Sequence, residues 1–265
     1  MAVMDEFKAE REYLKKHGTR QEKLAYFWDY YKWHTIVGVV ALIIVISSIY
    51  NALTAKDIVM SGILLNCTPT FDSTKQDELV LDFMAQQEIN TKKNEVFLNT
   101  SLYYSVFDNE SDIEYTNGES TYTASQIMLV QVASGDLDFI TGDLETLTSV
   151  AYSEFFVDLR TVLTKEQLAA YEPYLYYIDQ DVLEIIENAA DYSDDSTPVM
   201  IPDVDKPETM KTPIPVLIDL SRCEDIKLFY SNMKEDKPVV IGFTVNSKHA
   251  ELTGKFLDYL MNKAE

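Results

Sequence analysis

The stretch ASQIMLVQVASGDLDFITGD, residues 124–143, decides the fold class of this protein. Its first half is typical of a helix, which we expect to begin at Ser120 or Thr121 and to end near Ala133. A small-Gly-Asp turn follows, and the apolar run Leu137–Thr141 then predicts a short buried strand. A helix that leads through a tight turn into a buried strand is typical of domains in which helices and strands alternate.

Outward from this stretch, predicted strands and helices alternate along residues 57–265. The expected strands are Ile58–Asn66, Glu95–Tyr104, Leu137–Thr141, Ile214–Leu220 and Val239–Val245. The expected helices are Ser73–Ile89, Ser120–Ala133, Leu144–Phe155, Thr164–Tyr171 and His249–Asn262. This order predicts an α/β domain with a mostly parallel sheet sandwiched by helices. Residues 191–215 hold five of the eight prolines, so we expect a loop excursion there.

An uncharged apolar run, Thr35–Leu53, precedes this domain. It contains 19 residues, which at about 1.5 Å per residue give roughly 28 Å of helix, close to the hydrocarbon thickness of a bilayer. We therefore predict a transmembrane signal-anchor helix over residues 33–55, preceded by a charged helical segment over residues 1–32. The alternative for the apolar run is a buried core helix of a soluble domain.

Basic residues flank the apolar run unequally. Lys56 is the one basic residue close behind it, whereas five precede it: Lys15, Lys16, Arg20, Lys23 and Lys32. This bias predicts a cytoplasmic N-terminus and a C-terminal domain outside the cytoplasm. The aromatic residues before the run predict a belt at the membrane interface: Tyr26, Phe27, Trp28, Tyr30, Tyr31 and Trp33. A cleaved signal peptide is the alternative, but the long charged segment and the triplet Leu53-Thr54-Ala55 do not favour it.

Charge also divides at this run. Residues 1–34 contain 7 basic and 6 acidic residues, whereas the remainder contains 15 basic and 38 acidic residues, a net charge of −23. Such a domain repels nucleic acid, so we expect no nucleic-acid partner. An ordinary solvated acidic surface accounts for the charge without a cation site.

Three stretches carry a resemblance to known proteins. Residues 124–143, the stretch FFVDLRTVLTKEQLAAYEPYLY at 155–176 and VVIGFTVNSKHAELTGKFLDYLM at 239–261 resemble the first lobe of type II extracellular solute-binding proteins. The leader EKLAYFWDYYKWHTIVGVV at 22–40 resembles that of uncharacterised single-pass membrane proteins of Clostridia-type Gram-positive bacteria. Together the matches cover about half of the chain and include no catalytic signature.

The chain departs from that family in one respect. The family has a second lobe of a hundred or more residues between its crossover strand and its return strand. Here only residues 217–238 separate Ile214–Val216 from the strand at Val239–Val245. The resemblance therefore implies a single periplasmic-binding-protein-like lobe with a reduced second lobe, and no hinge that closes over a ligand.

The carboxyl ends of the predicted strands mark a candidate rim for a ligand or partner, because binding residues gather there in open α/β sheets. The rim residues are Asn66, Thr68, Thr70, Gly142, Asp143, Asp219 and Ser221. The alternative is that they are ordinary loop and cap residues.

No catalytic or metal-binding set is recognisable, so we expect no enzyme activity and no cofactor. Of the three histidines only His249 lies in the predicted domain after the membrane segment, and it is typical of a helix start. Ser231 and Lys234 match a Ser-x-x-Lys spacing without its companion motifs, which indicates chance. Acidic residues alternate at Asp108, Glu110 and Asp112 and at Asp203 and Asp205; calcium binding is the alternative to a solvated loop.

Cys67 and Cys223 are the only cysteines, and both follow predicted strands. Outside the cytoplasm they could form a disulfide, worth roughly 4 to 5 kcal/mol in the chain-entropy model. Free thiols are the alternative.

The leading functional hypothesis is a noncatalytic, membrane-anchored binding or interaction module outside the cytoplasm, such as an accessory subunit of a membrane complex. The alternative is a reduced solute-binding receptor that serves a transporter or sensor. The receptor would need a concave aromatic pocket, for which the candidates are Tyr103, Tyr104, Tyr174, Tyr176 and Tyr177. Under either hypothesis, the expected partners of this protein are the membrane and either a protein or a small solute.

Overall fold

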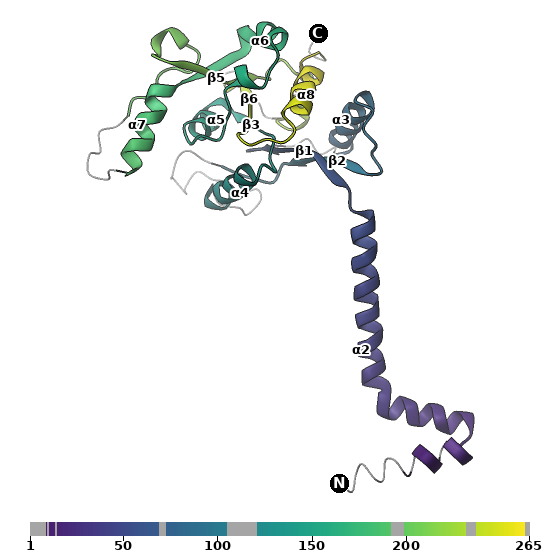
Figure 1. Ribbon diagram of the computed structural model, residues 1–265. Coiled ribbons are helices and arrows are strands. Elements are labelled where there is room, and N and C mark those ends of the chain that lie inside the picture. Colours follow the sequence, from purple (N-terminus) through teal and green to yellow (C-terminus); the bar gives the residue numbers. More distant parts are fainter. Residues whose placement is uncertain are drawn as a thin grey trace. The chain divides into compact units, whose positions relative to one another are not determined.

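The computed structural model describes residues 9, 11–13, 15–68, 73–104, 121–191, 199–231 and 237–262 (Figure 1). The chain divides into two compact units, Met1–Ala55 and Lys56–Glu265, and each is considered by itself.

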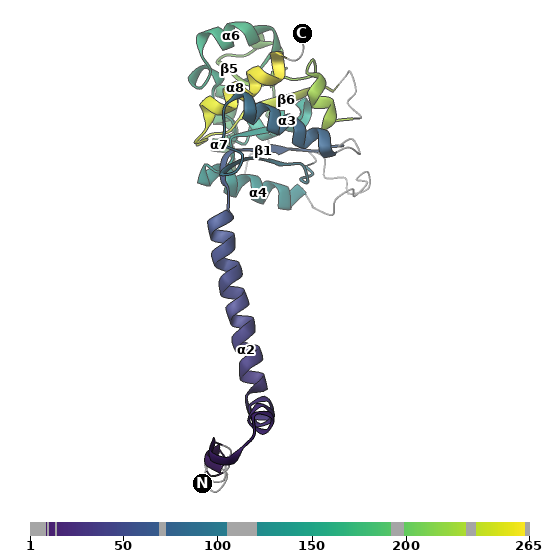
Figure 2. The same cartoon turned by 90° about the vertical axis from the view of Figure 1, so that its right-hand side faces the viewer.

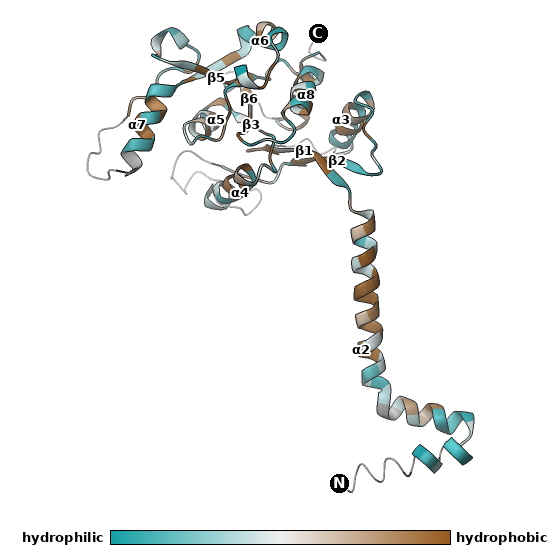
Figure 3. Ribbon diagram, in the orientation of Figure 1, coloured by the Kyte–Doolittle hydropathy of each residue, from teal (hydrophilic) through white to brown (hydrophobic). Residues whose placement is uncertain are grey.

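The first unit is dominated by one helix, α2 (Arg20–Thr54). Its N-terminus is closed by a capping box, in which Thr19 N–H donates to Glu22 Oε2 at 2.8 Å and Glu22 N–H donates to Thr19 Oγ1 at 3.4 Å. The most apolar 18 residues within Tyr31–Thr54 have a mean hydropathy of 2.4, and none of them is buried (Figure 3). By length and composition this segment can cross a membrane, and its exposure is unlike that of a soluble core helix.

The aromatic residues of the predicted belt lie along this helix. Phe27, Trp28, Tyr31 and Trp33 are exposed, and Tyr26 is half-buried. The side chain of Tyr30 lies outside the described part of the chain. Their place at a membrane interface stays a prediction.

The second unit contains a six-stranded sheet in the order β2-β1-β3-β6-β5-β4. The strands are β1 (Asp57–Leu64), β2 (Asn94–Asn99), β3 (Phe139–Asp143), β4 (Leu175–Asp179), β5 (Pro213–Asp219) and β6 (Val239–Phe243). β1 is parallel to β2 and β3, whereas β6 is antiparallel to both β3 and β5, and β4 is antiparallel to β5. β1, β2, β3 and β5 therefore run the same way, and β4 and β6 run the opposite way.

Helices cover both faces of this sheet. They are α3 (Ser73–Gln86), α4 (Thr121–Ser134), α5 (Leu144–Ala151), α6 (Lys165–Tyr171), α7 (Gln180–Asp191) and α8 (Ala250–Asn262). Short 3-10 turns are η1 (Leu159–Thr161), η2 (Glu172–Tyr174), η3 (Pro207–Thr209) and η4 (Glu224–Leu228). Figures 1 and 2 show α8 and α4 on opposite sides of β1.

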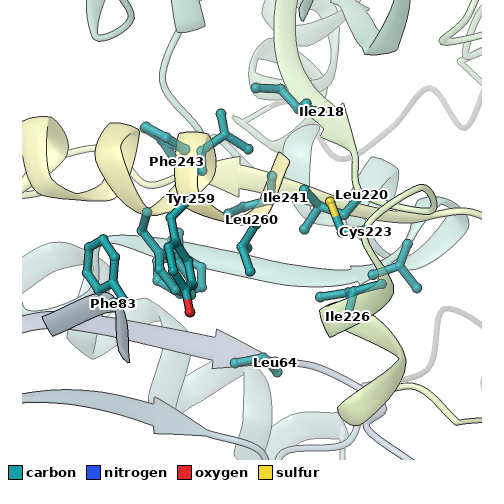
Figure 4. Packing of buried hydrophobic residues seen from close by; sticks show 14 of the residues in the cluster. Leu64, Phe83, Ile218, Leu220, Cys223, Ile226, Ile241, Phe243, Tyr259 and Leu260 are labelled. Carbon is teal, nitrogen blue, oxygen red and sulfur yellow. The ribbon is translucent and has the colours of Figure 1, made fainter. Parts of the chain in front are cut away.

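Strand alternation builds two separate apolar cores. Met60 and Leu64 of β1 pack with α3, α6, α8 and η4, whereas Ile63 and Leu65 pack with α4 and α5. Figure 4 shows the first core, in which side chains from strands and helices meet between α8 and η4. The predicted α/β class with a sheet sandwiched by helices is confirmed, and the sheet is mixed.

Several predicted boundaries are wrong. β2 ends at Asn99 and not at Tyr104, and the predicted helix 144–155 ends at Ala151. The sequence analysis missed β4 and α7 because β4 is a short strand whose tyrosines resembled ligand candidates. β5 begins at Pro213, inside the predicted excursion 191–215.

Candidate functional site

The carboxyl ends of β1, β3 and β5 lie at the same end of the sheet. Asp143 pairs with Val239 of β6, and Asp219 pairs with the next residue of that strand, Val240. The described rim residues therefore belong to neighbouring strand ends. Thr70 lies outside the described part of the chain.

Asn66 and Asp143 are occupied by hydrogen bonds within the protein. Asn66 has φ of 57°; its Nδ2 donates to Tyr104 O at 2.8 Å and its Oδ1 accepts from Tyr104 N–H at 2.8 Å. Asp143 caps α5, because its Oδ1 accepts from Thr146 N–H at 3.0 Å and its Oδ2 accepts from Thr146 Oγ1 at 2.8 Å. Asn66 Nδ2 also lies 3.3 Å from Asp143 Oδ2, which joins the two strand ends.

Thr68 and Gly142 are also structural. Thr68 O accepts from Ser231 N–H at 3.0 Å and from Ser231 Oγ at 2.7 Å, which holds the segment after η4 beside the end of β1. Gly142 is buried, and a Cβ there would lie 2.5 Å from Leu147 Cδ1. Helix α5 therefore packs too closely for a side chain at this position.

Asp219 and Ser221 shape the turn after β5. Ser221 N–H donates to Asp219 Oδ1 at 2.7 Å, and Ser221 Oγ accepts from Val239 N–H at 3.2 Å. Like the other described rim residues, they close caps and turns. The geometry thus matches the alternative interpretation of the rim, as ordinary loop and cap residues.

Two small cavities open near this end of the sheet, where β1, β3 and β5 terminate. One of about 350 Å³ is lined by Asp143, Asp203 and Lys237, among others. The other, of about 360 Å³, is lined by Tyr171, Tyr174, Arg222 and Asp258, among others. In the second, the Arg222 guanidinium lies 5.2 Å from the centre of the Tyr174 ring. Tyr171 OH donates to Asp258, and burial together with this carboxylate raises the pKa of Tyr171.

The five candidate tyrosines do not form one aromatic pocket in the described part of the chain. Tyr104 and Tyr176 pack against the core on the α4 and α5 side of the sheet, whereas Tyr174 packs against the core on the opposite side. The Tyr177 N–H donates to Val204 O at 2.8 Å, and Tyr103 lies in the extended segment after β2. The sheet therefore separates the rings that the receptor hypothesis would bring together.

The acidic clusters do not form a metal centre among the described residues, where no group of three potential ligands meets. Asp203 pairs with Lys206, and Asp205 lies in the same exposed segment. Asp108, Glu110 and Asp112 lie outside the described part of the chain.

Of the two alternatives for the cysteines, the structure contains free thiols at both Cys67 and Cys223 and no disulfide between them. Cys223 Sγ lies 3.5 Å from Met261 Sδ in the core, and Cys67 lies against the buried Tyr230. Each sulfur therefore has a different packing partner. Burial raises the pKa of both thiols to about 12.

These thiols are expected to resist alkylation in the folded protein. At pH 8 a pKa of about 12 leaves only about one thiol in ten thousand as the reactive thiolate. Iodoacetamide labelling, followed by mass spectrometry, should be at least about a thousandfold slower in native than in denatured protein. Without reductant, denaturation should release two reactive thiols; a protein that needs reductant to react would instead contain the disulfide.

The sequence analysis missed a buried polar cluster around Asp138. This carboxylate accepts from Ser61 N–H at 2.8 Å, from Ser247 Oγ at 2.6 Å and from His249 N–H at 3.2 Å. His249 Nδ1 also lies 3.2 Å from Asp138 Oδ2. Because the Ser247 hydroxyl donates to the carboxylate and not to the imidazole, the cluster holds the start of α8 and lacks the order of a Ser-His-Asp triad.

The two edges of the sheet differ. The β4 edge is covered by the chain itself, because Tyr177 N–H donates to Val204 O at 2.8 Å. At the end of β4, the Asp179 carboxylate accepts from Lys211 N–H at 2.9 Å and from Thr212 N–H at 3.1 Å, in the segment that leads into the neighbouring β5. Burial acts to raise the pKa of Asp179, but these backbone donors hold it below its ordinary value. In contrast, no described segment hydrogen-bonds to the outer side of β2.

A groove of about 440 Å³ runs between α3 and this open edge, and we call it the α3–β2 groove. The apolar residues that line it are Val80, Leu81, Met84, Val96, Phe97, Leu98 and Phe229. Leu81 is 51% exposed and Phe97 is 44% exposed. Lys56, Asp77 and Glu95 add charge to the lining. An open edge strand beside an apolar groove is the geometry that can accept an extended peptide.

Comparison with known proteins gives no relative. No family model, no curated protein and no solved structure matches this chain.

Proposed function

We propose that this chain is a noncatalytic, membrane-anchored interaction module whose folded domain, outside the cytoplasm, binds a partner protein. The apolar part of α2 anchors the module, with residues 1–32 on the cytoplasmic side. The module acts as an accessory subunit of a membrane complex. The observation that carries this proposal is the outer side of β2, to which no described segment hydrogen-bonds, beside the α3–β2 groove.

The partner contributes an extended segment that adds to the sheet next to β2. The backbone of this segment bonds to the outer side of β2, and every second side chain faces the α3–β2 groove. Leu81 and Phe97 supply apolar surface that is already exposed. Proteins usually protect edge strands, as this one does at β4, so an open apolar edge favours a binding role.

Charge restricts the partner further. The chain after His34 carries a net charge of −23, and Asp77 and Glu95 outnumber Lys56 among the charges that line the groove. We therefore expect the partner's segment to have apolar side chains at every second position and lysine or arginine among the residues beside them. Salt screens the attraction between the acidic domain and a basic partner, so binding decreases as the ionic strength rises.

The single-lobe origin of the domain is part of the same proposal. Two features support it: β6 returns antiparallel between β3 and β5, and only residues 220–238 lie between the end of β5 and the start of β6. A lobe that has lost its counterpart has no second wall to close on a solute, which favours a protein partner.

The test is capture of a partner from gently solubilised native membranes by tagged full-length protein and two matched double variants. The groove variant is L81K/F97K, and the control is L129K/V130K on α4, where both side chains are also exposed. Both variants add two positive charges at exposed apolar positions. The affinity of a captured protein, or of a peptide from it, is then measured for each.

The groove variant is expected to weaken binding at least about tenfold, or about 1.4 kcal/mol, while the control keeps it. Both proteins should retain their melting temperatures, because the four side chains are exposed. A partner that both variants capture equally well, or that neither captures, would refute docking at β2.

A reduced solute receptor is the second candidate, favoured by the cavity of about 360 Å³. Its lining presents Arg222 and Asp258 to the same space, a combination that suits a zwitterionic solute. A thermal shift of the wild-type protein with one solute class, lost in Arg222→Ala, would support this function in place of the interaction module.

A further inference from the structure

The first unit contains a cavity of its own. It has a volume of about 470 Å³ and lies between the helical residues 11–13 and 15–17 and the first turns of α2. We call it the basic cavity. Its described lining consists of Arg11, Lys15, Lys23, Tyr26, Phe27 and Tyr31. The volume is within the ~300 to 1,000 Å³ range of small-ligand sites.

A tight turn builds this cavity. Gly18 and Thr19 separate the helical residues 15–17 from α2, and the Thr19 capping box fixes where α2 begins. Lys23 Nζ then donates to Lys15 O at 3.3 Å across the turn. The rings of Phe27 and Tyr31 stack with their centres 5.5 Å apart, one turn further along α2. The three basic side chains and the aromatic rings thereby border one space.

The charged residues that line the basic cavity all have the same sign. Three cations border the basic cavity, and no carboxylate does among the described residues. Three other basic residues of the same segment do not line it: Lys16, Arg20 and Lys32. Cations that converge without a carboxylate suit a phosphate group, and aromatic rings suit the glycerol and upper acyl carbons of a lipid.

The position of the basic cavity along α2 indicates that the phosphate group belongs to a lipid. Tyr31, part of the cavity lining, is also the first residue of the apolar span Tyr31–Thr54. The cavity therefore comes at the depth where phosphates of a bilayer lie when the span is inserted.

We infer that the basic cavity binds the headgroup of an anionic phospholipid in the leaflet on the N-terminal side of the span. Arg11, Lys15 and Lys23 bind the phosphate, and Phe27 and Tyr31 pack against the glycerol end of the chains. This site is independent of the partner-binding role proposed for the second unit.

Trp28 and Trp33, the only two tryptophans of the chain, report on this site. Full-length protein is placed in phosphatidylcholine nanodiscs with a small fraction of phosphatidylglycerol carrying brominated acyl chains, which quench tryptophan fluorescence at close range. Matched discs carry the same fraction of brominated phosphatidylcholine. Three proteins are compared: wild type, R11Q/K15Q/K23Q and K16Q/R20Q/K32Q. Both triple variants lose three positive charges, but only the first changes the cavity lining.

Wild type should be quenched more strongly by phosphatidylglycerol than by phosphatidylcholine. The cavity variant should lose at least about tenfold in apparent lipid affinity, or about 1.4 kcal/mol, whereas the control variant should keep most of it. The charge-conserving K15R/K23R should bind as wild type does, and circular dichroism checks the helix content of each variant.

Three results would overturn the inference. Equal quenching of wild type by both lipids would mean no selectivity for anionic lipid. Equal losses in the two triple variants would mean diffuse attraction without a site. Relief of quenching by inorganic phosphate in the buffer would mean that the cavity binds free phosphate.

Discussion

Asp138→Ala is expected to lower the free energy of unfolding by about 3 to 5 kcal/mol. Asp138 is 1% exposed and joins three parts of the domain: Ser61 of β1, the start of β3 and the residues that lead into α8. Alanine would leave the N–H of Ser61 without its acceptor, and His249 would lose its carboxylate. The loss should appear in chemical denaturation of the full-length protein in detergent, followed by circular dichroism.

Asp136→Ala provides the control. Asp136 lies two residues earlier and pairs with Lys248 at 2.9 Å, but both side chains are exposed. An exposed ion pair contributes only about 0 to 1 kcal/mol, so this variant should unfold close to wild type. Similar losses in the two variants would contradict a special role for the buried carboxylate.

Phe83→Ala is expected to cost about 3 to 5 kcal/mol, because it empties the centre of a core. Phe83 is fully buried, with its ring centre 5.0 Å from that of Phe256 and 5.5 Å from that of Tyr259 (Figure 4). Tyr259 is held in place by its own hydroxyl, which donates to Asp82 Oδ2 at 2.7 Å. The aromatic neighbours therefore cannot easily collapse into the space that the ring leaves.

Leu81→Ala on the same helix separates stability from binding. Leu81 lines the α3–β2 groove and is half exposed, so its loss should change stability by less than about 0.5 kcal/mol. Phe83→Ala should lower the denaturation midpoint, whereas Leu81→Ala should reduce partner affinity alone. A large stability loss in Leu81→Ala would mean that this side chain belongs to the core.

The sequence predicted those features that local patterns encode. The absence of charge over Thr35–Leu53 indicated the apolar helix, and helix spacing followed by a Gly turn indicated the α4–β3 unit. The predicted helix start at Thr164 is confirmed, and Thr164 forms a capping box with Gln167, only three residues away. β4 was missed because its sequence, LYYID, shows neither apolar–polar alternation nor the aliphatic run of β6, which is equally short.

The candidate site was less predictable. Asn66, Asp143 and Ser221 are polar residues at strand ends, which is the sequence pattern of a ligand site and also that of caps and turns. Only the bonds to Tyr104, Thr146 and the backbone of Val239 distinguish the two. Those bonds depend on how separate segments meet.

The sequence by itself determined the α/β class, the apolar helix, the division of charge and the main helix starts, because each depends on neighbouring residues and on the periods of helix and strand. Only the tertiary structure decided that β6 lies between β3 and β5 and that Asp138 joins Ser61 to His249. It also decided that the β4 edge is covered, whereas no described segment hydrogen-bonds to the outer side of β2. These features join residues up to 111 positions apart, as from Asp138 to His249. Such contacts are selected by the packing of the whole domain and leave no local pattern.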